Sequence, residues 1–436
     1  MQKVKVIGAG LAGAEAAYYL ANRGIKVELY DIKPQSFTPA HTDENFAELV
    51  CSNSLKSNDV YSNACGLLKE EMRILGSLVM ESADLNAVPA GAALAVDRRV
   101  FAKYITDKIK SHENISIVTR EITEIPTSDG YAIIATGPLT TDKLCSDIKE
   151  KLSGDLHFFD ASAPIVAKDS IDMDFAFYGD RYGKGTGDHI NCPMNKQEYE
   201  TFVTELLAAK RFERHQFEVD AVFEGCMPVE VMAQRGFDSL RFGPLKPVGL
   251  EDPKTNKWAY ATLQLRKEDK EGTMYNLIGF QTNLLWSEQK RVFGMIPALR
   301  NAEFLRYGVM HRNTFINSPE VLNSDYSLKS NGKIFFAGQI TGVEGYVESA
   351  GSGLLAAIYL ERKLNAKPDI RISNKTVLGA LAEYITEKRQ DFQPINANFG
   401  ILPSPMGIWK DKKLKKHTQA EISIKEVRDF KKEILL

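Results

Sequence analysis

The sequence predicts an α/β protein in which a domain built on a parallel sheet is interrupted by an α+β insertion. A short β-branched run at residues 4–7 leads into a glycine-rich turn and then a helical pattern. A second buried-strand pattern, at residues 333–338, again ends in glycine late in the chain. Between them, residues 160–324 mix short strand-like runs with loops. A sheet that opens at the N-terminus and resumes after an inserted domain accounts for this order.

The N-terminal glycine turn belongs to a complete βαβ unit with the fingerprint of a Rossmann-like dinucleotide site. Gly8 permits the tight turn, Gly10 lets a pyrophosphate approach the backbone, and Gly13 allows the helix to pack closely on the strand. A helix expected from residue 14 to residue 23 would offer free N–H groups and the positive end of its dipole to the phosphates. The next strand ends at Asp31, whose carboxylate would accept hydrogen bonds from the adenosine ribose.

Two later segments favour FAD over NAD as the dinucleotide. Residues 131–137 form an apolar strand that ends in Ala-Thr-Gly, which is frequent in FAD-dependent oxidoreductases. The late strand at 333–338 precedes a helix expected over 352–364, with a glycine-bearing start at 349–353, and resembles the segment that holds the flavin ring in such proteins. We therefore expect a Rossmann-like, glutathione-reductase-like FAD-binding domain. Its cofactor contacts are expected at Gly8, Gly10, Gly13, Asp31, Gly137, Gly338 and Gln339.

The expected domain boundaries follow from the interruption of this fold. Residues 1–160 would form the first part of the FAD-binding domain and residues 325–436 the second part. The intervening residues 161–324 would form an α+β domain, called the insertion domain below. The chain closes on a stretch rich in lysine and helix-forming residues, from 410 to 436.

Composition excludes several classes of protein. The 436 residues are 44% hydrophobic and 26% charged, as in folded globular proteins, and the formal net charge of −2 excludes a strongly basic nucleic-acid binder. No window approaches the roughly 18 apolar residues that a membrane-spanning helix requires. The five cysteines are scattered and lack a CxxC pair, so no disulfide framework, thioredoxin-like pair or metal site is predicted. These features indicate a cytoplasmic protein that needs no membrane.

Several strings outside the glycine turn carry a resemblance to one family. They are FAELVCSNS at residues 46–54, VPAG at 88–91, FEGCMPVE at 223–230, YGVMHRNTF at 307–315 and GQITGVEGYVES at 338–349. With them the chain resembles the bacterial folate- and FAD-dependent tRNA (uracil-5-)-methyltransferases, from residue 4 to about residue 403. That family is related to the larger wobble-uridine-modifying flavoprotein, which lacks several of these strings. A close offshoot of the family methylates a uridine of 23S ribosomal RNA instead.

The resemblance implies methylation of uracil C5 at uridine 54 in the T loop of tRNA. Methylenetetrahydrofolate would supply the carbon, reduced FAD would act as carrier and reductant, and NADH or NADPH would reload the flavin. Uracil C5 is a poor nucleophile, so such enzymes first add a thiolate to C6. By resemblance Cys226 is this nucleophile, and Cys51 assists by removing the C5 proton or by protecting the flavin adduct. For Cys65, Cys145 and Cys192 we expect only small buried side chains.

The folate and the RNA each need further groups. By resemblance His311 and Tyr346 line the folate pocket, although core packing would also explain either side chain. Residues 235–312 hold 13 Lys and Arg against 8 Asp and Glu, and residues 410–436 hold 9 against 5. Such stretches can neutralise phosphates, or can simply be solvated surfaces, and the target base would have to be flipped out to reach the flavin.

Three alternative interpretations remain open at this point. Ala92, Leu245, Asp31 and Gly351 depart from the family's usual residues without removing a reacting group, which leaves room for the offshoot that acts on ribosomal RNA. An NAD(P)H-dependent flavin oxidoreductase acting on a small molecule would explain the FAD fold but neither cysteine string. A non-catalytic, flavin-bound RNA-binding protein would not need paired cysteines. The oligomeric state stays open.

Overall fold

The described residues form two large hydrophobic cores and one small cluster around Val88, Ala90 and Ala95. The computed structural model describes residues 3–38, 40–126, 130–152, 156–161, 163–183, 185–212, 227–308, 310–389, 392–407 and 410–435. The first core joins buried residues between Val4 and Ile148 to others between Phe315 and Ile434. The second core lies between Val166 and Ala302, inside the insertion domain. The first core is therefore made from both ends of the chain.

A five-stranded parallel sheet lies at the centre of the first core, which confirms the predicted fold class. Its strand order is β18 (Ile334–Phe336), β7 (Ala132–Ile134), β1 (Val4–Ile7), β2 (Val27–Asp31) and β6 (Ile115–Thr119). The late strand β18 thus joins the sheet beside β7, as an interrupted fold requires. β7 and β18 are wholly apolar and buried, whereas β2 and β6 also carry polar residues.

Two helices that pack on each other differ from their predicted bounds. α1 spans Leu11–Asn22 and begins three residues before the expected start, because Gly10 already acts as its N-cap. α10 spans Tyr346–Leu364, so the start predicted at residue 352 is wrong by six residues. Its glycines lie inside the helix rather than at its start because close packing needs them. A Cβ at Gly353 would lie 2.2 Å from the Ala12 carbonyl oxygen of α1.

Buried glutamate side chains tie several other helices of this domain together. Glu71 of α2 accepts hydrogen bonds from the N–H groups of Val377 and Leu378 at the start of α11, and from the hydroxyl of Ser423 in α12. Glu15 of α1 caps α3 in the same way.

The helices are α2 (Ala64–Leu75), α3 (Leu78–Leu85), α4 (Arg98–Lys110), α5 (Asp142–Leu152), α9 (Ser318–Val321), α11 (Val377–Thr386) and α12 (Lys412–Leu435). A small antiparallel sheet contains β3 (Ser54–Ser57), β5 (Ala93–Val96) and β4 (Ala87–Val88).

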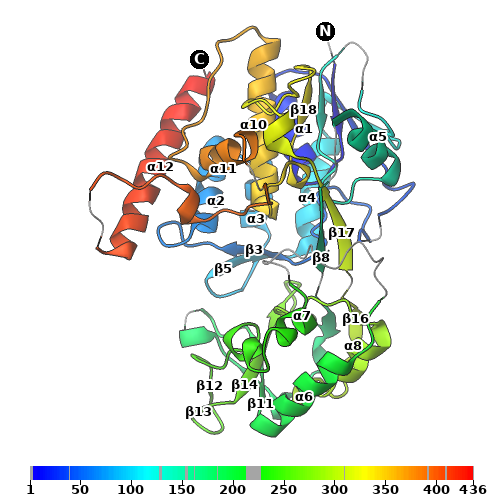
Figure 1. Cartoon of the computed structure of the whole chain (residues 1–436), viewed down its shortest axis with the longest axis vertical. Helices are drawn as coiled ribbons and strands as arrows, with labels where there is room; N and C mark the ends of the chain where they lie inside the picture. The colour runs from blue at the N-terminus through cyan, green and yellow to red at the C-terminus, as the bar shows by residue number, and fades with distance from the viewer. Residues whose placement is uncertain are drawn as a thin grey trace.

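The insertion domain contains a six-stranded antiparallel sheet. Its order is β10 (Phe177–Tyr178), β11 (Ile190–Met194), β14 (Ala261–Lys267), β15 (Met274–Leu277), β9 (Ile165–Ala167) and β16 (Phe304–Arg306). Around it lie α6 (Lys196–Ala208), α7 (Val229–Gln234), α8 (Trp286–Phe293) and the ribbon β12 (Glu251–Asp252) with β13 (Lys257–Trp258). The antiparallel pair β8 (Leu156–Ala161) and β17 (Met310–Phe315) runs between the two domains (Figure 1).

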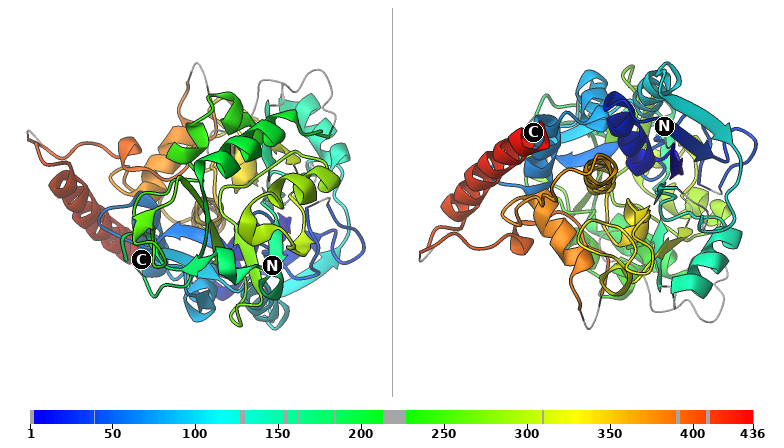
Figure 2. Two further views of the ribbon diagram at one scale, coloured as in Figure 1. Left: turned by 90° about the horizontal axis from the view of Figure 1, so that it is seen from below. Right: turned by 90° about the horizontal axis from the view of Figure 1, so that it is seen from above.

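The lysine-rich C-terminal stretch forms the long helix α12 at the periphery of the molecule (Figure 2). Its inner face is buried against the first domain through Gln419, Ala420, Ser423, Val427, Phe430 and Ile434. Its lysines are therefore left mainly on the outer face. Among the residues the structure describes, no helix is both long enough and apolar enough to cross a membrane.

Candidate active site

A cleft opens at the carboxyl ends of β1, β2 and β7, where open α/β sheets bind their ligands. The glycine turn, the end of β2 and the start of α10 all contribute to it. The predicted site residues that line the cleft are Gly8, Gly10, Asp31, Gly137, Gly338, Gln339 and Tyr346. Gly13 lies behind them, where a Cβ would come within 1.8 Å of the Gly8 carbonyl oxygen.

The glycine turn has the shape that a pyrophosphate requires. Gly8 has φ +96°, and a Cβ there would lie 2.6 Å from the Ala135 carbonyl oxygen. A Cβ at Gly10 would meet nothing within 4 Å, so the space in front of this residue is open. Gly10 is also the N-cap of α1 and no side chain caps it, which leaves N–H groups of the first turn for an anion. These residues fit the diphosphate of a dinucleotide.

The carboxylate of Asp31 holds the turn in place. It accepts hydrogen bonds from the N–H of Ala9 at 2.7 Å and from the N–H of Lys33 at 2.9 Å. Each oxygen keeps a further lone pair, and Asp31 lines the cleft, so the side chain can also accept from a ribose hydroxyl. Ribose binding by Asp31 stays a prediction.

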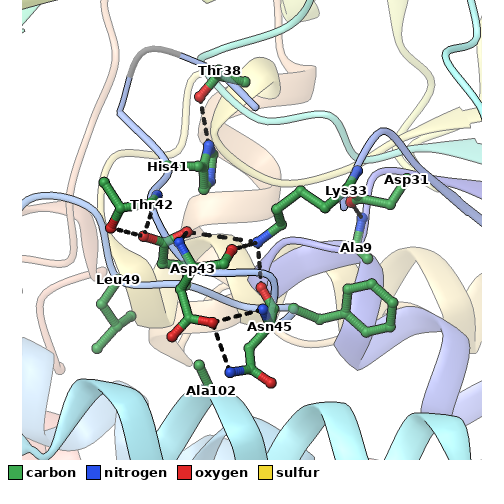
Figure 3. Close-up of polar contacts among 12 residues, drawn as sticks. Ala9, Asp31, Lys33, Thr38, His41, Thr42, Asp43, Asn45, Leu49 and Ala102 are labelled. Atoms are coloured by element: carbon green, nitrogen blue, oxygen red, sulfur yellow. Dashed lines mark hydrogen bonds and ion pairs between the residues drawn. The ribbon is translucent and has the colours of Figure 1, made fainter. Parts of the chain in front are cut away.

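A polar cluster that the sequence analysis missed forms the wall of the cleft beyond β2 (Figure 3). The buried Lys33 ammonium donates to the carbonyl oxygens of Asp43, at 3.1 Å, and of Asn45, and lies 3.6 Å from a carboxylate oxygen of Glu48. His41 lines the cleft and its Nδ1 shares a hydrogen bond with the hydroxyl of Thr38. Burial lowers the pKa of His41, which favours the neutral imidazole.

Cys51 lies in a loop that is fixed to the start of α10 by Tyr346. The N–H groups of Cys51 and Ser52 donate to the Tyr346 hydroxyl at 2.8 Å and 3.0 Å. Burial raises the pKa of Tyr346 well above its usual range, so the acceptor is a neutral phenol. The structure thus brings together Cys51 and Tyr346, two of the predicted site residues, beside the cleft that Tyr346 and the neighbouring Val50 line.

Three arginines hold the rest of this loop, and two of them come from the insertion domain. Arg306 donates to the Val50 carbonyl oxygen at 2.6 Å, and Arg266 donates to the Ser52 hydroxyl at 2.7 Å. Arg98 donates to the Leu49 carbonyl oxygen at 3.1 Å. The loop is therefore the joint between the two domains.

The joint also concentrates positive charge. The buried carboxylate of Glu268 lies 2.6 Å from the guanidinium of Arg98. Burial lowers the pKa values of Arg266 and Arg306, because the charged guanidinium is less well solvated there than in water. Three cations and one anion meet at the Cys51 loop, and none of the arginines was singled out from the sequence. Only contacts between distant segments reveal them.

Cys226 falls outside the described residues, but both flanks of its segment are visible. Before it, Phe212 N–H donates to the Asn283 carbonyl oxygen at 3.0 Å. After it, Val229 N–H donates to the Gln281 carbonyl oxygen at 2.7 Å. Buried Glu230 accepts from the Asn283 N–H at 2.8 Å and from the Thr282 hydroxyl at 2.9 Å, and burial raises its pKa. One stretch, residues 281–283, therefore fixes both ends of the segment.

The other candidate residues are placed as follows. His311 lies in β17 opposite Asp160 of β8, and its side chain is outside the described part of the structure. Cys192 is fully buried in β11, where burial raises its pKa, whereas Cys65 and Cys145 are half-buried. Among the described residues, no group of three or more His, Cys, Asp or Glu side chains could hold a metal ion.

Comparison with known proteins places the chain in a family. A protein-family model described as glucose inhibited division protein A matches residues 3–368. Proteins named methylenetetrahydrofolate--tRNA-(uracil-5-)-methyltransferase TrmFO from Caldicellulosiruptor bescii and Acetivibrio thermocellus are each 55% identical, covering 99% and 98% of both chains. The corresponding Staphylococcus epidermidis protein is 54% identical over 99% of both chains.

Solved structures agree with this placement at the level of the fold. Aquifex aeolicus GidA, in two crystal forms, matches with TM-scores of 0.72 and 0.73 at 15% and 16% identity. The match covers 99% of this chain and 73% and 76% of those chains. With curated relatives more than half identical over almost the whole length, the chain belongs to the TrmFO family, within the wider group that the glucose inhibited division protein A model describes.

Proposed function

We propose that this protein methylates uracil C5 of uridine 54 in the T loop of tRNA. Uridine, methylenetetrahydrofolate, NAD(P)H and a proton are converted to 5-methyluridine, tetrahydrofolate and NAD(P)+. The methylene group supplies the carbon, and the nicotinamide supplies the hydride that completes the methyl group. FAD, when bound, would supply the chemistry that carries the methylene group and passes on the hydride. A cytoplasmic location accords with this substrate.

The observation that carries the proposal is the Cys51 loop, which Tyr346 holds beside the dinucleotide cleft. The loop touches the cofactor-binding domain through Tyr346 and the insertion domain through Arg266 and Arg306. A small-molecule oxidoreductase would have no need to fix a cysteine between two domains in this way. The identity of more than half with the TrmFO relatives supports the same function.

The residues of this chain have separate tasks in the proposed reaction. The glycine turn and the first turn of α1 would bind the diphosphate of FAD, and Asp31 its adenosine ribose. Cys226 would add to C6 of the flipped uracil, which turns C5 into the nucleophile. After the new bond to C5 forms, a base must take the C5 proton before Cys226 can leave. We assign Cys51 either to removal of the C5 proton or to protection of the group that carries the methylene.

His311 and Tyr346 are proposed to line the folate pocket. Tyr346 lies at the cleft, where its ring can lie against a flat ligand while its hydroxyl holds the Cys51 loop. Arginines around the loop supply positive charge for the anions that meet there, among them the folate carboxylates and the RNA phosphates.

The proposal is tested by mapping the methylated nucleotide. Purified FAD-loaded protein is incubated with methylenetetrahydrofolate, NADPH and either unmodified tRNA or 23S ribosomal RNA, and 5-methyluridine is located by mass spectrometry. We expect product at uridine 54 of tRNA. Product only on ribosomal RNA would assign the chain to the offshoot, and no product on either RNA would refute the proposal.

The role of Cys226 is tested in the same assay. Cys226→Ala should abolish 5-methyluridine formation while the protein keeps its bound FAD and its NADPH oxidation. Loss of FAD from this variant would mean that Cys226 is structural instead. Cys192→Ala serves as the matched control because Cys192 is buried in a strand of the insertion domain, away from the cleft.

A further inference from the structure

A row of four aromatic rings lies in the insertion domain, with Phe212 at one end and Phe304 at the other. Phe304 and Tyr307 stack with ring centroids 5.4 Å apart and planes at 5°. Tyr307 stacks on Trp286 at 5.8 Å and 13°, and Trp286 meets the edge of Phe212 at 6.4 Å. We call these four residues the aromatic row.

Each end of the row is linked along the chain to one of the two cysteine segments. Phe212 immediately precedes the segment that contains Cys226. At the other end, Phe304 lies on β16, the strand whose Arg306 donates to the Val50 carbonyl oxygen in the Cys51 loop. The row therefore connects the flank of one reactive cysteine to the support of the other.

Hydrogen bonds fix the backbone at Phe212 and beside Tyr307, and so fix the positions of these rings. The fully buried amide of Gln289 donates to the Gly308 carbonyl oxygen and accepts from the Gly308 N–H, both at 2.8 Å, which fastens the backbone beside Tyr307 to α8. Asn283 fixes the backbone of Phe212: its carbonyl oxygen accepts from the Phe212 N–H at 3.0 Å, and its side-chain amide donates to the Phe212 carbonyl oxygen at 3.2 Å. The geometry of the row is thus set before any ligand arrives, which reduces the entropy cost of binding.

Packing of the insertion domain does not explain the row. Trp286 is 54% exposed and Phe212 is 42% exposed. Of the four rings only Phe304 packs against the second core, as far as the described residues show. Large aromatic side chains left in water on a pre-formed platform mark a binding surface rather than a core.

Cations next to the row indicate what it binds. Lys290 follows Trp286 by four residues on α8, so the two side chains lie on the same face of the helix. Lys210 precedes Phe212 by two residues. Both lysines are exposed, and neither has a carboxylate partner among the described residues. Exposed aromatic rings flanked by unpaired cations suit a ligand that carries both flat rings and phosphates.

We propose that the aromatic row is a stacking platform for unpaired nucleobases of the RNA substrate. Bases next to the flipped uridine would stack on Trp286 and its neighbours while Lys210 and Lys290 approach the phosphates. Every base has a π-face, so the platform holds the opened loop without reading its sequence. This inference rests on the proposed function, since it assumes that the substrate is an RNA with an opened loop.

Substitution of Trp286 tests the platform in the FAD-loaded full chain. Trp286→Ala should raise the Kd for unmodified tRNA, and the KM for tRNA in methylation, by about tenfold to a hundredfold. Trp286→Phe should restore most of the affinity because it keeps a stacking ring. Trp258→Ala is the matched control, since Trp258 is 56% exposed in the same domain but outside the row, and it should leave both constants unchanged.

Fluorescence tests stacking directly and does not depend on activity. The chain has three tryptophans, so Trp258→Phe combined with Trp409→Phe leaves Trp286 as the only one. Its emission should be quenched by a T-arm hairpin with an unpaired loop, and much less by a fully paired RNA duplex of equal length. This measurement decides the matter if Trp286→Ala loses FAD or fails to fold.

The outcomes separate this inference from the proposed function. If the wild-type protein methylates no RNA yet the hairpin quenches Trp286, the platform stands and the proposed reaction fails. If methylation proceeds but Trp286→Ala changes neither Kd nor KM and no quenching occurs, the platform is refuted alone. If Trp286→Ala instead converts a dimer to a monomer in sedimentation velocity with unchanged RNA affinity, the row is a contact between copies of this chain and the inference is wrong.

Discussion

The N–H of Cys51 donates a hydrogen bond of 2.8 Å to the hydroxyl of Tyr346, a residue 295 positions later in the chain. The same hydroxyl accepts from the N–H of Ser52 at 3.0 Å. One phenol oxygen therefore sets the backbone of the loop that presents the cysteine. This contact gives Tyr346 a task that a ring lying against folate would not require.

Replacing Tyr346 by phenylalanine separates these two tasks. Tyr346→Phe keeps the ring but leaves two N–H groups without their acceptor, at a cost of about 1–3 kcal/mol for a buried group. We expect kcat to fall by about tenfold to a hundredfold with the FAD content and the KM for methylenetetrahydrofolate unchanged. Tyr346→Ala should in addition raise that KM. A Tyr346→Phe enzyme with wild-type kcat would show that the hydroxyl contact is dispensable.

From the open space in front of Gly10 we predict that a substitution there gives a protein that folds but binds FAD weakly. A Cβ at Gly10 meets nothing within 4 Å of the protein, so Gly10→Ala should leave the Tm of the FAD-free protein unchanged. The added methyl group would occupy the space of the diphosphate, so the Kd for FAD should rise. Gly236→Ala is the control, because a Cβ there also meets nothing but lies in the insertion domain. Equal FAD affinity in both variants would contradict the assignment of the turn.

Glu71 predicts a dependence of stability on pH. Burial raises the pKa of Glu71 from 4.5 to about 7, against the opposing effect of its hydrogen bonds to Ser423, Leu378 and Val377. Between these two values the unfolded chain has lost a proton that the folded protein keeps. The free energy of unfolding should therefore fall as the pH rises from about 4.5 to 7, by at most about 3 kcal/mol from this residue.

Urea unfolding at several pH values measures this effect. Glu71→Gln cannot lose the proton, so its free energy of unfolding should vary less between pH 5 and pH 7 than that of the wild type. Glu70→Gln changes a more exposed carboxylate on the same helix and should keep the wild-type slope. A Glu71→Gln protein with the full wild-type slope would assign the pH dependence to other groups.

We predict that Glu230 positions the segment that contains Cys226. Glu230→Ala removes the acceptor for Asn283 and Thr282, so the flank of the segment loses its anchor. We expect kcat for methylation to fall at least tenfold while bound FAD and NADPH oxidation stay at wild-type levels. Glu230→Gln, which keeps one acceptor oxygen, should recover part of the rate.

A second carboxylate in the insertion domain controls for lost stability. Glu198 belongs to the capping box at the start of α6, so Glu198→Ala should lower the Tm at a cost of about 1 kcal/mol. In the part of the chain that the structure describes, Glu198 is hydrogen-bonded to Asn195 and not to residues 281–283, so the kcat of Glu198→Ala should match the wild type. If both variants lose activity in proportion to their Tm, Glu230 acts only through stability.

The sequence predicted the parts of this protein that are local in the chain. The βαβ unit from Val4 to Asp31 carries its strand, turn and helix signals within about 30 residues, and both strands and the helix formed. The late strand β18 was also predicted, because an apolar run ending in glycine is a strong local signal. The start of α10 was wrong, since tertiary packing against α1 keeps its glycines inside the helix.

Contacts between distant segments could not be predicted in this way. Arg266 and Arg306 meet the Cys51 loop only after two domains have folded and docked. The hydrophobic pattern of β14 and β16 says nothing about which oxygen atom of the loop a guanidinium will reach. The aromatic row has the same origin, since Phe212 and Tyr307 are almost a hundred residues apart in the sequence.

The interruption of the first domain has a consequence for biosynthesis. The sheet that binds the dinucleotide is completed by β18, and the cleft by the start of α10, so both must leave the ribosome before the site exists. The insertion domain has its own core and can fold earlier, while β7 waits for its partner β18 about 200 residues downstream and α1 waits for α10 more than 300 residues downstream. FAD should therefore be captured only near the end of translation, when α10 and α12 close the first core.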